Sequence, residues 1–236
     1  RNVRFGDLNG DGQVDILIGQ VEDHSYPWNS FSELSCLTAM TFDGTILWQT
    51  GTPKKIPHDL ANDVAFQIYD LDGDGKNEVI YTMGCKMIVA DGATGKIKKS
   101  IDTPEKRQVQ SERGNPKNII KIWDRVLGDC LFFCDLRGTG KARDIILKDR
   151  YEQFWVYDEN LKFRWTGKCT TGHYPYARDI DGDGKEELFM GYSMFRDNPK
   201  PVYSWDDRVK DHNDGVAAVN FRAVPDAGIE VFSAAS

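Results

Sequence analysis

One acidic pattern of nine residues occurs three times in the chain and constrains its fold more than any other feature. The copies span 7–15, 70–78 and 179–187. Each places oxygen-bearing side chains at alternate positions, glycines where the chain must turn, and a carboxylate at the ninth position. Hard divalent cations such as calcium prefer this set of oxygen ligands. The pattern therefore predicts three calcium (Ca2+) loops, with the following ligands: Asp7, Asn9, Asp11, Asp15, Asp70, Asp72, Asp74, Glu78, Asp179, Asp181, Asp183 and Glu187.

The segments on both sides of each loop favour strands over helices. An EF-hand loop has the same initial spacing, but its last carboxylate is the twelfth residue and helices flank it. Here apolar residues follow the ninth-position acid at once, at 16–18, 79–81 and 188–190. Short runs rich in strand-forming residues also precede the loops. Each loop is therefore expected to join two β-strands.

The loops mark a repeated unit of four strands. In the second copy the pattern predicts strands over 63–69, 78–83, 87–90 and 96–101, with a turn at 91–95. Four antiparallel strands that recur at roughly 40–65 residues are typical of the blades of a β-propeller. We therefore predict an all-β fold, a β-propeller of four-stranded antiparallel blades. The calcium loop of a blade would join its first and second strands.

One further unit has the same order of strand, turn and strand but lacks two of the ligands. Within 130–147, Arg137 and Thr139 stand where the other copies carry Asp or Asn. A guanidinium cannot bind a cation, and its charge repels one. This loop is predicted to hold no calcium, and Arg137 is predicted to form an internal ion pair with Asp135 or Asp144.

The repeat pattern extends to the end of the sequence. A fifth unit is expected to start with a strand at 215–222, followed by a second strand at 229–232. Residues 1–236 are thus predicted to form four blades and the beginning of a fifth. We expect them to be part of a larger propeller.

Composition restricts the kinds of molecule that the chain is expected to bind. A formal charge of −7 disfavours nucleic acid and anionic membranes, although three bound calcium ions would bring the chain close to neutrality. No apolar run approaches the roughly 20 residues of a membrane-spanning helix. Neither nucleic-acid binding nor membrane insertion is therefore expected. The five cysteines are too few and too irregularly spaced for a disulfide framework, and we expect buried thiols.

Blade topology sorts the loops between two ends. The calcium loops and the turns between third and fourth strands share one end, and the remaining loops share the other. The pair Arg150–Tyr151 and the segment 102–128 are expected at this second end. All four histidines also fall there, and we call it the histidine end: His24, His58, His173 and His212.

Histidine, tyrosine and arginine side chains together suit β-elimination at a uronic acid. This reaction needs a cation that neutralises the carboxylate, a base that removes the adjacent proton, and an acid for the leaving oxygen. Arg150 is the predicted neutraliser. The candidates for base and acid are His173, His212, Tyr174 and Tyr151. The substrate-binding candidates at the same end are His24, His58, Arg107, Arg113 and Lys117.

The repeats resemble those of known propellers. The acidic loops, their apolar strands and the hairpin Asp91-Gly-Ala-Thr-Gly-Lys96 resemble the FG-GAP/VCBS type of calcium-binding propeller. Segments 65–79 and 172–188 also resemble blades of secreted polysaccharide lyases, namely rhamnogalacturonan lyases and ulvan lyases of propeller type. The resemblance implies a secreted or periplasmic, calcium-dependent lyase acting on an acidic polysaccharide. It carries over calcium ligands but no catalytic positions.

Two other functions stay open at this point. A non-catalytic propeller that binds carbohydrate or a protein partner carries the same loops. A glycoside hydrolase would use two carboxylates, and four aspartates are expected at the histidine end: Asp59, Asp63, Asp211 and Asp214.

Overall fold

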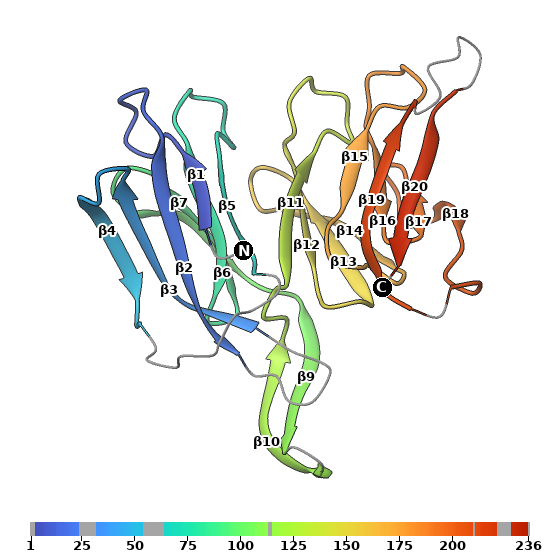
Figure 1. The fold of residues 1–236 in the computed structure, drawn as a ribbon, viewed down its shortest axis with the longest axis horizontal. Helices are drawn as coiled ribbons and strands as arrows, with labels where there is room; N and C mark the ends of the chain where they lie inside the picture. Colours follow the sequence, from blue (N-terminus) through green and yellow to red (C-terminus); the bar gives the residue numbers. More distant parts are fainter. Residues whose placement is uncertain are drawn as a thin grey trace. The chain divides into compact units, whose positions relative to one another are not determined.

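The structure is a computed structural model, and every regular element that it describes is a β-strand (Figure 1). It describes residues 3–23, 32–53, 64–112, 115–209, 211–220 and 228–235. The sheets in these ranges are antiparallel, which confirms the predicted all-β class. Two compact units divide the chain, Arg1–Leu131 and Phe132–Ser236.

The first unit contains two four-stranded sheets and a long hairpin. In both sheets the strands follow one another in sequence order. The first sheet consists of β1 (Val3–Gly6), β2 (Asp15–Asp23), β3 (Ser32–Thr41) and β4 (Ile46–Gly51). The second consists of β5 (Phe66–Tyr69), β6 (Glu78–Met83), β7 (Lys86–Asp91) and β8 (Ile97–Asp102). The hairpin consists of β9 (Glu105–Glu112) and β10 (Asn115–Arg125).

An apolar core joins the two sheets of this unit. Leu17 and Leu37 of the first sheet belong to the same buried cluster as Phe66 and Tyr81 of the second. Within one sheet, the central strands are more buried than the last strand. Strand β6 is buried at five of its six positions, whereas β8 is mostly exposed. Face-to-face packing of neighbouring sheets therefore encloses the core.

The second unit repeats this organisation. One sheet consists of β11 (Cys130–Cys134), β12 (Asp144–Lys148), β13 (Gln153–Tyr157) and β14 (Phe163–Lys168). Another consists of β15 (Tyr176–Arg178), β16 (Glu187–Met190), β17 (Ser193–Phe195) and β18 (Pro201–Ser204). Two further strands, β19 (Asn213–Val219) and β20 (Glu230–Ala235), pair with each other. They lie close to the two strands expected at 215–222 and 229–232.

Buried clusters again join neighbouring sheets. Phe154 of β13 packs in one cluster with Leu188 and Phe195 of the next sheet. Phe189 and Met194 then share a second cluster with Ala218 of β19. The second unit is thus a series of sheets packed face against face.

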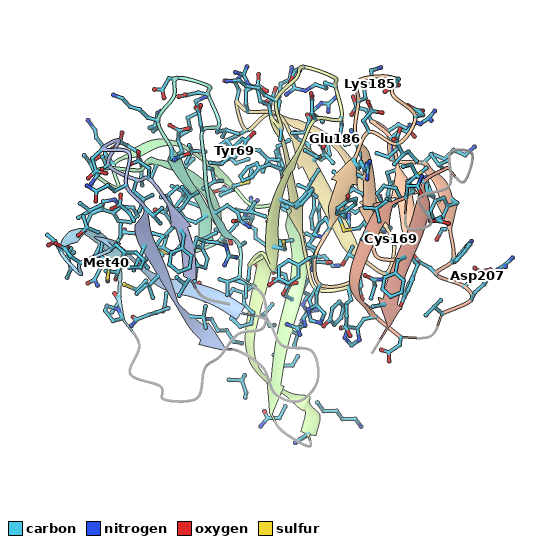
Figure 2. The ribbon with its side chains drawn as sticks, turned by 45° about the horizontal axis from the view of Figure 1, so that its top comes forward. Met40, Tyr69, Cys169, Lys185, Glu186 and Asp207 are labelled. Atoms are coloured by element: carbon cyan, nitrogen blue, oxygen red, sulfur yellow. The ribbon has the colours of Figure 1, made fainter. Side chains whose placement is uncertain are left out.

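Each acidic loop joins the first and second strands of its sheet, as predicted. The last strand residue before the loop pairs with the ninth-position acid, in the pairs Gly6–Asp15, Tyr69–Glu78 and Arg178–Glu187. Figure 2 shows Lys185 and Glu186 in the loop between β15 and β16. The register of each hairpin therefore fixes where its loop closes.

Other expectations have mixed outcomes. All five cysteines are free, and four of them are buried, in agreement with the predicted thiols. The β9–β10 hairpin within 102–128 was not predicted, because its polar sequence carries no loop motif. In the part of the chain that the structure describes, no helix is long and apolar enough to cross a membrane.

Candidate active site

Three connections of the second unit meet at one end of its sheets. They are the β12–β13 turn, the β14–β15 connection and the β18–β19 connection. The Tyr151 N–H donates a hydrogen bond to Thr171 Oγ1 over 3.0 Å. The His173 N–H donates to the carbonyl oxygen of Asn213 over 2.9 Å. These bonds link the three connections at the predicted histidine end of this unit.

Three rings from these connections pack together. The Tyr151 ring stacks on His212 at a centroid distance of 4.9 Å and meets the edge of His173 at 5.5 Å. The two imidazoles lie 5.1 Å apart. Tyr151 Oη and His173 Nε2 are 3.3 Å apart, which is within hydrogen-bond reach. We call Tyr151, His173, His212 and Asp214 the Tyr151 cluster.

Carboxylates lie beside both imidazoles. His212 Nδ1 lies 2.8 Å from Asp211 Oδ1, and His212 Nε2 lies 3.4 Å from Asp214 Oδ1. The same Asp214 oxygen is 3.6 Å from His173 Nε2. The Asp211 carboxylate, at hydrogen-bond distance, fixes the orientation of the His212 ring. The His173, His212 and Asp214 side chains are 16%, 29% and 43% exposed, so a ligand can reach them.

The cluster has the donor set of a proton-transfer site and also of a metal site. One ligand atom from each of His173, His212 and Asp214 lies within 4.8 Å of the others. Imidazole nitrogen and carboxylate oxygen are common ligands of divalent metals. The geometry therefore suits either general acid–base chemistry or a bound cation.

Two cations lie beside the Tyr151 ring. The Arg150 guanidinium carbon is 5.0 Å from the ring centroid, and Lys148 Nζ is 6.0 Å from it. Lys148 is fully buried at the end of β12, where Nζ donates to the carbonyl oxygen of Asp149 over 3.2 Å. Sequence reasoning missed Lys148, although a lysine directly after the apolar run 145–147 is a detectable signal.

Tyr151 has a strained backbone. Its φ angle is +80°, in the left-handed region that non-glycine residues rarely adopt. Such strain persists only where the surrounding structure maintains it, and it is concentrated at functional sites. The bond from Tyr151 N–H to Thr171 and the packing on His212 supply that support here.

The remaining predicted site residues lie elsewhere or outside the described residues. Tyr174 follows His173 directly, and 42% of it is exposed. Arg107 and Lys117 are exposed on the β9–β10 hairpin of the first unit, so they belong to a different unit from the Tyr151 cluster. Four expected residues at the histidine end lie outside the described residues: His24, His58, Asp59 and Asp63, as does Arg113.

The acidic loops form the second candidate site. In each loop the first aspartate accepts two backbone N–H groups through its two oxygens, as Asp70 does from Gly73 and Gly75. The ninth-position acid accepts the N–H of the residue after the first aspartate, as Glu78 does from Leu71 over 2.9 Å. Asp7 with Asp15, and Asp179 with Glu187, repeat this scheme.

Two of the loops bring three carboxylates within metal-binding distance. The groups are Asp70, Asp72 and Glu78, and Asp179, Asp181 and Glu187, each with ligand atoms within 4.8 Å of one another. A cationic side chain from the same sheet also contacts each group. Lys98 Nζ lies 2.7 Å from both Asp72 and Glu78, and Arg196 contacts Asp181 and Glu187 at 2.7 Å and 3.3 Å.

These contacts shift the pKa values of the groups involved. The hydrogen bond from Lys98 lowers the pKa of Asp72, and the bonds to Asp72 and Glu78 raise the pKa of Lys98. Burial raises the pKa of Glu187. The loops thus concentrate negative charge, and the side chains of Lys98 and Arg196 offset part of it.

The loop at 135–144 lacks this charge. Arg137 Nε pairs with Asp144 Oδ1 at 2.9 Å, and Arg137 Nη2 donates to Glu159 over 2.5 Å. Arg164 Nη1 reaches the same Asp144 oxygen at 2.9 Å. Of the two partners predicted for Arg137, Asp144 is therefore the one found. Asp144 is fully buried between the two guanidinium groups.

A comparison with known protein families bears on the first half of the chain. Residues 1–114 match the C-terminal domain of rhamnogalacturonan lyase family 11. The Tyr151 cluster lies outside that segment. The chain is also 24% identical over 248 residues to rhamnogalacturonan exolyase YesX of Bacillus subtilis, an alignment that covers 84% of this chain and 39% of YesX.

A second relative is similar in both sequence and structure. Rhamnogalacturonan endolyase YesW of Bacillus subtilis is 26% identical over 247 residues, covering 84% of this chain and 38% of YesW. Its crystal structure superposes with a TM-score of 0.68 at 21% identity, over 100% of this chain and 46% of that one. The chain thus spans less than half the length of these relatives, and the superposition shows a shared fold.

A biofilm protein shares the fold as well. The matrix protein Bap1 of V. cholerae superposes with a TM-score of 0.60 at 22% identity, covering 98% of this chain and 34% of Bap1. Sequence similarity therefore links the chain to rhamnogalacturonan lyases, whereas the fold alone extends to a matrix protein.

Proposed function

We propose that this chain is part of an extracellular or periplasmic polysaccharide lyase that cleaves rhamnogalacturonan by β-elimination. The observation that carries the proposal is the contact of Tyr151 with His173 and His212, beside Arg150, in a chain similar to rhamnogalacturonan lyases. The family match favours rhamnogalacturonan over ulvan. The resemblance to secreted lyases supports the location.

His173 and Tyr151 act as the proton-transfer pair in this proposal. His173 removes the proton at C5 of a uronate, the electron pair forms the C4–C5 double bond, and the C4–O bond breaks. Tyr151 donates its hydroxyl proton to the leaving oxygen. Because Tyr151 Oη and His173 Nε2 are 3.3 Å apart, the imidazolium proton can return to the phenolate and restore both groups.

The neighbouring residues stabilise the charges that form. Asp214 lies within 3.6 Å of both His173 and His212 and places a negative charge beside the imidazolium that forms after proton abstraction. Arg150 lies on the Tyr151 ring and neutralises the uronate carboxylate, which makes the C5 proton more acidic. Arg150 and Tyr151 come from the β12–β13 turn and His173 from the β14–β15 connection, and together they supply base, acid and cation.

Calcium and a propeller fold are further parts of the proposal. The carboxylate groups at Asp70, Asp72 and Glu78 and at Asp179, Asp181 and Glu187 fit a calcium ion, as does the loop at 7–15 by its sequence. Calcium there would neutralise carboxylates that otherwise repel one another. Face-to-face packing of successive four-stranded sheets supports their assignment as blades.

The test is the appearance of an unsaturated product. Incubation of the protein with rhamnogalacturonan should raise near-ultraviolet absorbance, because β-elimination creates a conjugated double bond. His173→Ala and Tyr151→Phe should lower the rate by about 10²–10⁴-fold with little change in melting temperature. Tyr157→Phe is the matched control, because it removes the hydroxyl group of a buried tyrosine outside the cluster.

The same assay separates the other two functions. Release of reducing sugar without absorbance would favour a glycoside hydrolase and point to Asp211 and Asp214. Binding of the polysaccharide without any cleavage would favour a non-catalytic propeller. Either result would contradict the lyase proposal.

A further inference from the structure

The β12–β13 turn contains buried polar groups that the proposed mechanism does not use. The carbonyl oxygen of Asp149 receives three donors: the Tyr151 N–H over 3.1 Å, the Lys148 ammonium over 3.2 Å and the Thr171 hydroxyl over 3.4 Å. Lys148 and Thr171 are fully buried. Hydrogen bonds are stronger in such an interior, and the loss of one leaves a buried polar group without its partner. These contacts therefore fix the turn in which Tyr151 adopts its strained φ angle.

Thr171 links this turn to the connection that carries His173. Thr171 Oγ1 accepts the Tyr151 N–H over 3.0 Å and donates to a carbonyl of the turn, so the hydroxyl is acceptor and donor at once. Gly172 follows with a φ angle of +65°, and a Cβ atom there would lie only 2.5 Å from the Asn213 carbonyl oxygen. The backbone between Thr171 and His173 thus has little freedom to move. The Thr171 hydroxyl therefore sets the position of Tyr151 relative to His173.

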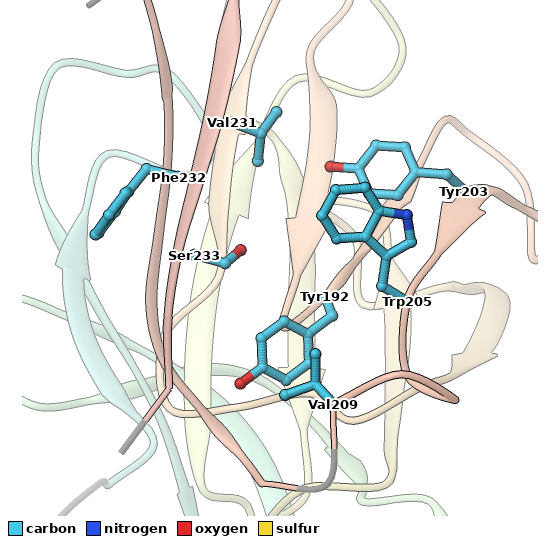
Figure 3. A pocket seen from close by; sticks show the side chains of 7 residues that line it. All are labelled: Tyr192, Tyr203, Trp205, Val209, Val231, Phe232 and Ser233. Carbon is cyan, nitrogen blue, oxygen red and sulfur yellow. The ribbon is translucent and has the colours of Figure 1, made fainter.

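His212, on which the Tyr151 ring stacks, is fixed by other contacts. The Tyr192 hydroxyl donates to the His212 carbonyl oxygen over 3.1 Å. Figure 3 shows the Tyr192 side chain in the wall of one pocket with Val209, which precedes His212 in the β18–β19 connection. Loss of the Thr171 hydroxyl leaves these contacts in place. It would therefore move Tyr151 relative to an imidazole that stays fixed.

A buried threonine of the first unit shows a comparable arrangement without the rings. Thr103 follows β8 and bonds to the β6–β7 turn, where its N–H and its hydroxyl lie 2.9 Å and 3.1 Å from the carbonyl oxygen of Cys85. Cys85 has a φ angle of +59°, also in the left-handed region. A threonine that supports a left-handed residue in this turn is thus a feature of the fold. In the second unit the supported residue carries the phenol proposed as the acid.

We propose that Thr171 is a positioning residue for the lyase reaction, because its hydroxyl holds the Tyr151 phenol where it exchanges a proton with His173. The proposal rests on the proposed function. Thr171 is fully buried, so it acts through Tyr151 and does not touch the polysaccharide. Proton transfer depends on hydrogen-bond distance, and a misplacement of about 1 Å costs on the order of 10²-fold in rate. The 3.3 Å separation of Tyr151 Oη and His173 Nε2 leaves little room for such a shift.

Thr171→Val tests the proposal, because it keeps the shape of the side chain and removes the hydroxyl. On rhamnogalacturonan, kcat should fall about 10- to 100-fold with KM within about twofold of the wild-type value. Thr171→Ser keeps the hydroxyl and should restore most of kcat. A wild-type kcat in Thr171→Val, or a kcat in Thr171→Ser as low as in Thr171→Val, would overturn the proposal.

Thr103→Val is the matched control, because it removes a buried hydroxyl that supports a turn of the first unit. Both valine variants should lower the melting temperature by a few degrees, the cost of one buried hydrogen bond, and only Thr171→Val should lose activity. Equal losses of kcat would show a general effect of instability and overturn the positioning role. If Thr171→Val does not fold, Thr171→Ala takes its place, because it removes the same hydroxyl without adding a methyl group beside the Tyr151 N–H.

Imidazole NMR signals test the same role without substrate. The Tyr151 and His212 ring centroids are 4.9 Å apart, so the ring current of Tyr151 shifts the His212 C–H signals. Thr171→Val should move these signals toward their positions in Tyr151→Ala, whereas Thr103→Val should leave them unchanged. If they move and the wild type forms no unsaturated product, the lyase proposal fails and Thr171 still positions the ring. If product forms and neither the signals nor kcat respond to Thr171→Val, the positioning proposal fails and the lyase stands.

Discussion

The loops at 70–78 and 135–144 have the same hydrogen-bonding scheme and opposite charge. In both, the first aspartate accepts two backbone N–H groups, as Asp135 does from Thr139 and Gly140. In both, the last carboxylate accepts the N–H that follows the first aspartate, as Asp144 does from Leu136. Aspartate and glycine residues therefore form the turn in both loops, whether a metal ion or a basic side chain neutralises the carboxylates.

The difference lies in the source of that cation. The loop at 70–78 carries four carboxylates, and Lys98 from β8 contacts two of them. The loop at 135–144 carries Arg137 within the loop itself, and Arg164 from β14 adds a second guanidinium at Asp144. We infer that the negative charge of this turn is neutralised in two ways. A bound calcium ion neutralises it in the acidic loops, and arginine side chains neutralise it in the loop at 135–144.

Removal of calcium should have the largest effect. An ion that binds only the folded state stabilises it by about 2.7 kcal/mol at one hundred times its Kd. For a domain of this size that corresponds to roughly 5–10 °C per occupied loop. Chelation should therefore lower the melting temperature, measured by circular dichroism or calorimetry. An unchanged melting temperature would show that the acidic loops do not depend on a metal.

A matched pair of variants assigns that effect to particular loops. Asp74 and Thr139 occupy the same position in the two loops. Asp74→Ala should reduce the stabilisation by calcium, and the variant and the wild type should converge after chelation. Thr139→Ala should shift the melting temperature equally with and without calcium. A calcium-dependent shift in Thr139→Ala would break the comparison.

Arg137→Ala should have the next largest effect. It leaves the fully buried Asp144 with Arg164 alone and removes the partner of Glu159. Removing one member of a buried ion pair costs several kcal/mol, and because 26% of the Arg137 side chain is exposed we expect about 2 kcal/mol. Urea unfolding measures the loss, which should be independent of calcium.

The control for that variant is an exposed pair. Lys86 and Asp102 are 2.7 Å apart, and both side chains are more than half exposed. Lys86→Ala should cost less than about 1 kcal/mol. If Arg137→Ala costs no more than Lys86→Ala, the guanidinium is not a structural substitute for a cation.

The sequence predicted the structural features that depend on short segments of the chain. Spacing of Asp and Gly located the loops and their flanking strands. It also predicted an ion pair of Arg137 with Asp135 or Asp144, and the structure shows the pair with Asp144. It did not predict Lys98 of β8, Arg164 of β14 or Arg196 in the turn after β17, because these residues reach the loops only through the pairing of strands within the sheet. Register between strands is set by the whole sheet and cannot be read from one segment.

The same limit applies to the candidate active site. Blade topology placed Tyr151, His173 and His212 at one end, and the structure brings them into ring contact. Topology could not predict which of them would touch, because contact depends on the conformations of three separate connections. The buried Lys148 and the φ angle of Tyr151 also arise from this tertiary packing.

Lys98→Met gives the smallest and most discriminating effect. Lys98 Nζ lies 2.7 Å from Asp72 Oδ2 and from Glu78 Oε1, and both residues are proposed calcium ligands. Without calcium the ammonium group offsets the repulsion between these carboxylates, so its removal should cost up to about 1 kcal/mol. With calcium the same ammonium group repels the ion, so Lys98→Met should bind calcium more tightly by a few-fold.

The sign of the effect of Lys98→Met on the melting temperature should therefore reverse between chelator and calcium. Calorimetric titration should show the tighter calcium binding. Lys86→Met, on β7 and paired with Asp102, is the control and should show no reversal. If Lys98→Met is destabilising in both conditions, Lys98 is an ordinary structural partner of the loop and does not compete with a metal.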